Sequence, residues 1–290
     1  WLDSGQCRDC FIPSFNYRPG GSAQYGMAIS NFDEENPKRF NFGFIASSDN
    51  HRARPGTGYK EIDRFVTTEA NGPSSEFVAD TLYPKDEVKS ESIDLREGEL
   101  LGLRAGFGAF EAEREASFFS TGGLAAVHSS GRDRNSIWKG LQRKETYGTS
   151  GDRILLWFDL VSEDSAVPMG GSVETSNNPV FRAKAVGAFK QKAGCPDYSS
   201  TNISDQEIER ICKNECYNPS DERKIISRIE VIKVTPQTYE GENVDNLISD
   251  PWRVFACEPS QQGCEVEFSD EEFNSDARDA SYYVRAIQEP

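Results

Sequence analysis

The sequence predicts an α/β unit in residues 1–152, followed by an antiparallel β-sandwich-like domain in residues 153–290. Three observations support this division. A length of 290 residues favours two domains and allows a sizeable core. In the first part, short apolar strands end in polar residues and alternate with helical patterns. After Gly151, strand-like segments follow one another with turn residues between them, which is typical of an antiparallel sandwich.

The first part opens with a loop rich in Gly, Pro and Cys in residues 1–20. A helix is predicted over residues 22–31, where Ser22 is the candidate N-cap. A polar connection then leads to residues 42–46, an apolar run that predicts a buried strand. This order of helix, connection and buried strand is one step of an α/β fold.

Asp49 and His51 follow directly after that predicted strand, two residues apart. On an extended backbone this spacing points both side chains to the same side. A carboxylate and an imidazole that converge in this way are suitable ligands for a divalent metal ion. The alternative is a loop aspartate that caps a backbone amide beside a histidine, and the spacing alone favours neither interpretation.

The loop after His51 is basic, although the chain as a whole is acidic. Arg52 and Arg54 lie in it, together with glycines and a lysine. Guanidinium groups bind phosphate, sulfate and carboxylate in bidentate geometry, so the cluster is a candidate anion-binding loop. Each arginine taken singly is equally consistent with a solvated loop that pairs with nearby acidic residues.

Residues 64–121 contain no long periodic segment and are interpreted as an elaboration over the core, either a lid or a substrate wall. Residues 122–128 then predict a second short buried strand, which ends at His128. A helix follows over residues 133–143, with Asp133 as its cap and Ile137, Trp138 and Leu141 as its buried face. Because His128 ends a strand, it is a candidate base, ligand or substrate contact, although a lone histidine is more often structural.

The second part is predicted to be almost entirely strands. Its one exception is a short helical insertion in residues 195–222, where Ser204 and Glu207 form a capping box. The strand segments are residues 154–160, 179–186, 225–234, 254–257, 265–268 and 281–287.

Composition limits the possible partners and the compartment. The formal net charge is −16, from 48 acidic and 32 basic residues, which argues against a nucleic-acid partner. No segment approaches the roughly 18 apolar residues of a membrane span. Seven cysteines favour an oxidising location, periplasmic or extracellular.

Six of the cysteines form local pairs that are candidate disulfides, and Cys195 is left over. Zinc binding is the alternative for the first pair, but no second pair at finger or ribbon spacing follows it. The candidate pairs are Cys7 with Cys10, Cys212 with Cys216, and Cys257 with Cys264.

Residues 42–51, FGFIASSDNH, resemble the late Ser-Asp-x-His metal motif of the polymerase-and-histidinol-phosphatase (PHP) superfamily of metallohydrolases. Residues 122–128 and 137–154 resemble the last β-α unit of that barrel, in the form found in carbaryl-hydrolase-like members and in a large bacterial PHP-related family of unknown function. Residues 250–253 and 281–290 also resemble that family. The resemblance extends over most of the chain.

The resemblance implies that residues 1–152 are the C-terminal part of a distorted (β/α) barrel in which Asp49 and His51 bind zinc, manganese or iron. The early His-x-His pair of such barrels has no counterpart among the two histidines of this chain. Two ligands do not complete a catalytic zinc site. The remaining ligands are therefore expected from an N-terminal part of the same protein, upstream of Trp1.

The function expected from these features is metal-dependent hydrolysis of a small-molecule phosphate ester. In this hypothesis His128 moves a proton, Arg153 stabilises developing charge, and Arg52 and Arg54 hold an anionic group. An ordinary ion pair is the alternative for Arg153. Hydrolysis of a carbamate or carboxylic ester is the second hypothesis, and a secreted, non-catalytic binding module with a degenerate barrel is the third.

Overall fold

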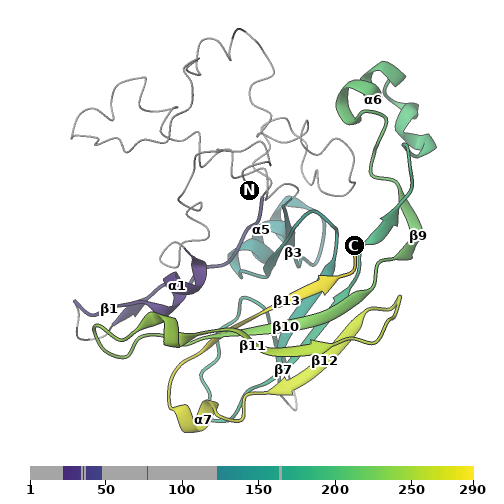
Figure 1. Cartoon of the computed structure of the whole chain (residues 1–290). Coiled ribbons are helices and arrows are strands. Elements are labelled where there is room, and N and C mark those ends of the chain that lie inside the picture. The colour runs from purple at the N-terminus through teal and green to yellow at the C-terminus, as the bar shows by residue number, and fades with distance from the viewer. Residues whose placement is uncertain (1–21, 34, 36, 48–76, 78–122, 163–164) are drawn as a thin grey trace, which may run out of the picture.

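The computed structural model describes residues 22–33, 35, 37–47, 77, 123–162 and 165–290. Strands dominate these residues, and the few helices are short (Figure 1). The helices are α1 (Ala23–Ala28), α5 (Arg134–Gln142), α6 (Asp205–Cys212) and α7 (Phe273–Asp276), with 3-10 turns at Asp197–Thr201 and Val244–Leu247. The strands are β1 (Ser30–Asn31), β2 (Lys38–Arg39), β3 (Leu124–Val127), β4 (Thr146–Thr149), β5 (Leu155–Val161), β6 (Ala166–Pro168), β7 (Val180–Val186), β8 (Phe189–Gln191), β9 (Pro219–Arg223), β10 (Ile226–Val234), β11 (Ile248–Ala256), β12 (Cys264–Ser269) and β13 (Ser281–Gln288).

Two antiparallel sheets form the centre of the described structure. One has the order β11-β10-β13 and the other the order β12-β7-β5-β6. Buried residues of both sheets share one hydrophobic cluster, so the sheets pack face to face with the core between them (Figure 1). This confirms the antiparallel strands predicted for the second part, with boundaries that differ by a few residues.

Alternation along β7 shows why the sequence adopts this arrangement. Phe181, Ala183 and Ala185 are buried, whereas the residues between them are exposed. Since side chains of a strand alternate between its two faces, one face enters the core and the other meets solvent. On the outer face, Arg182 and Lys184 pair with Glu265 and Glu267 of β12.

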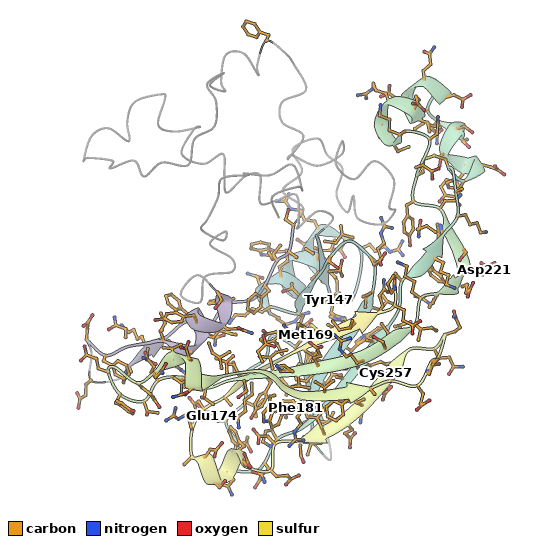
Figure 2. All side chains as sticks on the ribbon, in the orientation of Figure 1. Tyr147, Met169, Glu174, Phe181, Asp221 and Cys257 are labelled. Carbon is orange, nitrogen blue, oxygen red and sulfur yellow. A yellow bond between two sulfur atoms is a disulfide. The ribbon has the colours of Figure 1, made fainter. Side chains whose placement is uncertain are left out.

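Aromatic rings fill much of the space between the sheets. Phe181 lies 5.3 Å from Phe158, 5.5 Å from Phe268 and 4.6 Å from Tyr282, measured between ring centroids. Figure 2 labels Phe181 among these side chains. Burial of each such phenylalanine contributes about 1.5–3 kcal/mol, so this cluster is a main source of stability for the two sheets.

A buried polar network lies within the same core. Asp270 is fully buried, and its Oδ2 lies 2.7 Å from Nζ of Lys233. The hydroxyl of Tyr282 donates to the same oxygen at 2.5 Å, and the backbone N–H of Glu272 donates to Oδ1. Burial alone would raise the pKa of Asp270, but the hydrogen bonds from Lys233 and Tyr282 together outweigh it and lower that pKa. The network therefore holds Asp270 as a carboxylate.

Tyr282 should make folding stability fall at alkaline pH. Burial, and then its bond to Asp270, raise the pKa of this phenol above the ordinary value of 10.0. A raised folded-state pKa gives stability that is complete below pH 10 and declines as the pH rises further. We expect Tyr282→Phe to lose about 1.5–3 kcal/mol at pH 7 and to show a shallower decline above pH 10 in urea unfolding. Tyr198→Phe, at a side chain that is 70% exposed, is the control and should change neither quantity.

The opposite face of β10 is covered by α1. Ala28 packs with Ile232 and Val234 in a second buried cluster. The carbonyl of Ala28 also accepts a hydrogen bond from the backbone N–H of Gln237. Ser22 caps this helix, as predicted, by accepting from the N–H of Tyr25. These contacts cross the domain boundary predicted at residues 152 and 153.

An arm extends from the two sheets between β8 and β9 and carries α6 at its end (Figure 1). Ser204 is the N-cap of α6, as predicted, and accepts from the N–H of Glu207. The carboxylate of Glu207 pairs with Arg210 one turn later. Ile208 is the buried apolar residue of this short helix.

The first part differs from its prediction in its sheet, in residues 42–46 and in the exposed face of α5. The described residues contain no closed barrel, and β3 and β4 pair antiparallel although α5 lies between them. Residues 42–46 form no regular strand. Phe42 is 39% exposed, Phe44 is 40% exposed and Ile45 is 69% exposed. The apolar run was thus a misleading signal for burial. The rings of Phe42 and Phe44 instead contact each other edge to face, with centroids 5.3 Å apart. In α5, Asp133 is the cap as predicted, but Ile137 and Trp138 are exposed.

Candidate functional site

The segment of residues 41–47 lies along β4. Lys144 Nζ donates to the carbonyl and side-chain oxygens of Asn41, and Thr146 Oγ1 donates to the carbonyl of Phe44 at 2.7 Å. A side-chain carbon on Gly148 would lie 2.5 Å from the Cβ of Ala46, so glycine is required for this close approach. The contacts join residue 41 to residue 144, residue 44 to residue 146 and residue 46 to residue 148, so the numbers rise together. Residues 41–47 therefore run in the same direction as β4.

The end of this segment meets the beginning of β3. A side-chain carbon on Gly123 would lie 2.5 Å from the carbonyl oxygen of Ser47. In the β3–β4 register, Leu124 lies opposite Thr149, and Val127 lies opposite Thr146. Ser47 is therefore at one end of the hairpin and His128 at the other, roughly 16 Å away along five extended residues. His128 therefore does not lie at the edge near Ser47, because β3 runs opposite to residues 41–47.

His128 is held by the neighbouring sheet. Its Nε2 lies 2.8 Å from the carbonyl oxygen of Leu156 in β5, and its ring lies beside Tyr147 and Trp157. A carbonyl oxygen can only accept, so Nε2 is the donor in this contact. The absence of a side chain at Gly140 lets α5 approach, since a carbon there would lie 2.5 Å from the carbonyl oxygen of His128. These contacts give His128 a structural role in joining the hairpin to β5.

The titratable groups around His128 are paired. Hydrogen bonds from Arg143 lower the pKa of Glu145 against the effect of burial, and the charges of Arg143 and His128 act in the same direction. Burial raises the pKa of Tyr147, whose hydroxyl donates to the carbonyl of Ile154. Glu145 is thus a carboxylate and Tyr147 a neutral phenol at neutral pH.

Arg153 lies past the end of β4, on the side where residues 41–47 also end. Its guanidinium carbon is 3.8 Å above the ring centre of Tyr217 in the arm, and its side chain is otherwise exposed. Asp152 beside it accepts from Lys224 Nζ at 2.9 Å and from the side chain of Gln288. Among the described residues, the ion pair at this point of the chain is made by Asp152, and Arg153 makes the cation–π contact.

The cysteines confirm one predicted pair and correct another. Cys257 and Cys264 form a disulfide across the turn between β11 and β12. Cys216 pairs with Cys195, not with Cys212, which is a free thiol. The reason is the pairing of the arm: Lys192 N–H donates to the carbonyl of Asn218, which continues the β8–β9 ladder and brings residue 195 opposite residue 216. Disulfides are compatible with an extracellular or periplasmic location.

The remaining predicted site residues lie outside the described part of the chain. They are Asp49, His51, Arg52, Arg54, Cys7 and Cys10.

Two further features that sequence reasoning missed are the contact of Tyr217 with Arg153 and the ion pair of Lys224 with Asp152. Both join residues more than 60 positions apart, so no local pattern indicates them.

Within the described ranges, one group of three potential metal ligands lies close together, formed by Cys195, Cys212 and Cys216, whose sulfurs are all within 4.8 Å of one another. Two of these sulfurs are joined in the disulfide, so they are not thiolate ligands in this state. None of the helices in the same ranges is both long and apolar enough to span a membrane.

Comparison with known proteins gives one match. A family model described as "Protein of unknown function (DUF3604)" matches residues 18–192, which include α1, the β3–β4 hairpin and the strands through β8. No curated protein and no solved structure matches the chain. The matched range is more than half of the 290 residues. The chain therefore belongs to this family, Protein of unknown function (DUF3604).

Proposed function

We propose that this chain is part of a metal-dependent hydrolase that cleaves a phosphate ester of a small molecule. Asp49 and His51 are the proposed metal ligands, on the basis of the resemblance of residues 42–51 to the Ser-Asp-x-His motif of the PHP superfamily. A carboxylate and an imidazole suit zinc, manganese or iron. When bound, such an ion would lower the pKa of a coordinated water and polarise the scissile group.

The common direction of residues 41–47 and β4 is the observation that supports this proposal most. Two segments that run the same way deliver the residues that follow them to the same edge. Asp49 follows two residues after Ser47, and Arg153 follows four residues after Thr149. An arginine near a metal-bound ester would bind its anionic oxygens and stabilise the charge that develops during hydrolysis. Arg52 and Arg54 would contribute to the same anion site.

The ligand set needs at least one further member. A catalytic zinc site has three protein ligands and one open position. His128, the second histidine of the chain, lies at the opposite end of the hairpin and donates Nε2–H to Leu156. We therefore assign His128 a positioning role and expect the further ligand from a carboxylate of this chain or from residues outside it.

Elemental analysis combined with a panel of esters tests the proposal. We expect a first-row divalent metal to copurify with the protein, and p-nitrophenyl phosphate to be hydrolysed faster than p-nitrophenyl sulfate or p-nitrophenyl acetate. Chelation with EDTA should abolish turnover, and readdition of zinc or manganese should restore it. Preference for the acetate, or for an aryl carbamate, would support the carboxylic-ester or carbamate alternative instead. A protein without metal and without turnover on every ester would contradict the proposal and favour a binding module.

A further inference from the structure

Three sulfur atoms are in mutual contact in the arm, at the C-terminal end of α6. Cys212 Sγ lies 3.0 Å from Cys216 Sγ and 3.8 Å from Cys195 Sγ, whereas Cys195 and Cys216 are joined by the disulfide. Cys212 is partly buried and is the free thiol among the described cysteines. A thiol in contact with a disulfide is the arrangement that thiol–disulfide exchange requires.

We propose that Cys216 exchanges its disulfide partner between Cys195 and Cys212. The thiolate of Cys212 attacks Cys216 Sγ, the Cys212–Cys216 bond forms, and the Cys195–Cys216 bond breaks with its electron pair on Cys195. The proton that Cys212 loses to solvent is matched by the proton that Cys195 gains. One disulfide and one thiol are present before and after the exchange, so no oxidant or reductant is needed.

The local hydrogen bonds favour departure of Cys195. The backbone N–H of Cys216 lies 3.2 Å from Cys195 Sγ and is oriented to donate to it. A donor in this position stabilises the negative charge that the leaving sulfur acquires. In the pairing that the structure shows, the thiol of Cys212 donates to the carbonyl of Ile208 at 3.2 Å. The N–H of Cys216 is the contact that favours Cys195 as the sulfur released.

A small rearrangement must precede the exchange. A thiolate attacks along the extension of the disulfide bond, so an attacking sulfur 3.0 Å from Cys216 would lie about 5 Å from Cys195. The observed separation is 3.8 Å, which places Cys212 beside the bond. The linker after Cys212 contains Lys213 and Asn214, both with positive φ, at 53° and 59°. A left-handed conformation costs such residues roughly 1–2 kcal/mol each, so other conformations of this linker lie close in energy.

The exchange would change which loop of the chain the disulfide closes. The Cys195–Cys216 bond ties the two ends of the loop that carries α6, across a sequence separation of 21 residues. A Cys212–Cys216 bond would close only the turn after α6 and leave the loop open at residue 195. Tyr217, the next residue after Cys216, stacks under Arg153, which lies between β4 and β5. The partner of Cys216 would therefore affect this contact between Tyr217 and Arg153.

Mapping of the free thiol tests this inference. The full chain is incubated without reductant at pH 6.5 or pH 8.5, quenched in acid, unfolded, labelled with N-ethylmaleimide and digested for mass spectrometry. We expect label on both Cys212 and Cys195, with the approach to a constant ratio about tenfold faster per pH unit while the thiol form dominates. Label on Cys212 alone at every pH and time would overturn the proposal.

Two variants separate exchange from other sources of a free Cys195. In Cys212→Ser, the label on Cys195 should fall at least tenfold, because the attacking sulfur is gone. In Cys195→Ser, mass spectrometry should find the Cys212–Cys216 disulfide. If label on Cys195 persists in Cys212→Ser, it arises from reduction rather than exchange, and the proposal fails. None of these outcomes depends on metal binding or ester hydrolysis.

Discussion

Replacement of Lys233 by methionine is expected to destabilise the protein by about 3–5 kcal/mol, because it leaves a buried carboxylate without its cation. Lys233 is 9% exposed at its side chain, and its Nζ lies 2.7 Å from Oδ2 of the fully buried Asp270. Methionine has nearly the same length and apolar volume, so the loss reports the charge and not a cavity. Urea unfolding at pH 7, followed by tryptophan fluorescence, measures the free energy of unfolding.

An exposed pair provides the matched control. Lys190 and Glu222 lie 2.7 Å apart, with side chains 49% and 60% exposed, so Lys190→Met should change stability by less than about 1 kcal/mol. The double variant Lys233→Met with Asp270→Asn removes both charges and should recover much of the lost stability. A loss below 1 kcal/mol for Lys233→Met alone would show that Asp270 is neutral in the folded protein.

Replacement of Asp49 by alanine is expected to remove the metal and to reduce ester hydrolysis by at least about 100-fold while the fold is retained. Loss of a residue that only supports a metal ligand already costs about 10–100-fold in affinity or activity. Loss of a direct ligand should therefore reach or exceed the upper end of that range. Metal content by elemental analysis, turnover of p-nitrophenyl phosphate and the circular dichroism spectrum are measured on the same preparation.

Asp221→Ala is the matched control for this variant. Asp221 is an exposed carboxylate on β9, in the arm (Figure 2). We expect this variant to retain its metal and its turnover. Full metal content and activity in Asp49→Ala would show that Asp49 is not a ligand, and the proposed site would be wrong. Equal losses in both variants would indicate a general effect of acidic charge rather than coordination.

Local sequence patterns were sufficient for the elements that depend on residues close together in the chain. Ser22, Asp133 and Ser204 cap their helices as predicted, since an N-cap bonds an amide only two or three residues away. A strand was also predicted over residues 179–186, where the structure has β7 (Val180–Val186). The pair Cys257–Cys264 spans a short turn and was predicted from spacing alone.

The apolar run of residues 42–46 shows where such patterns fail. Its composition favours a buried strand, yet Phe42 and Phe44 are substantially exposed, and the segment lies along β4 through contacts with Lys144 and Thr146. Hydrophobicity gives a tendency to be buried, but it does not say which partner surface is available. The direction of this segment relative to β3, which places Ser47 and His128 at opposite ends of the hairpin, likewise had no signature in the sequence.

The sequence by itself determined the antiparallel strands after Gly151, the caps of the helices and the disulfide across the turn between β11 and β12. The domain division at residues 152 and 153 and the metal ligands Asp49 and His51 stay predictions. The tertiary structure decided that Cys216 pairs with Cys195, that Lys233 meets Asp270 inside the core, and that Arg153 stacks on Tyr217. The physical reason is the range of the interactions. Helix caps and strand alternation follow from the geometry of a few consecutive residues. Disulfide partners, buried ion pairs and strand direction depend on how distant segments pack, and many pairings are compatible with the same local sequence.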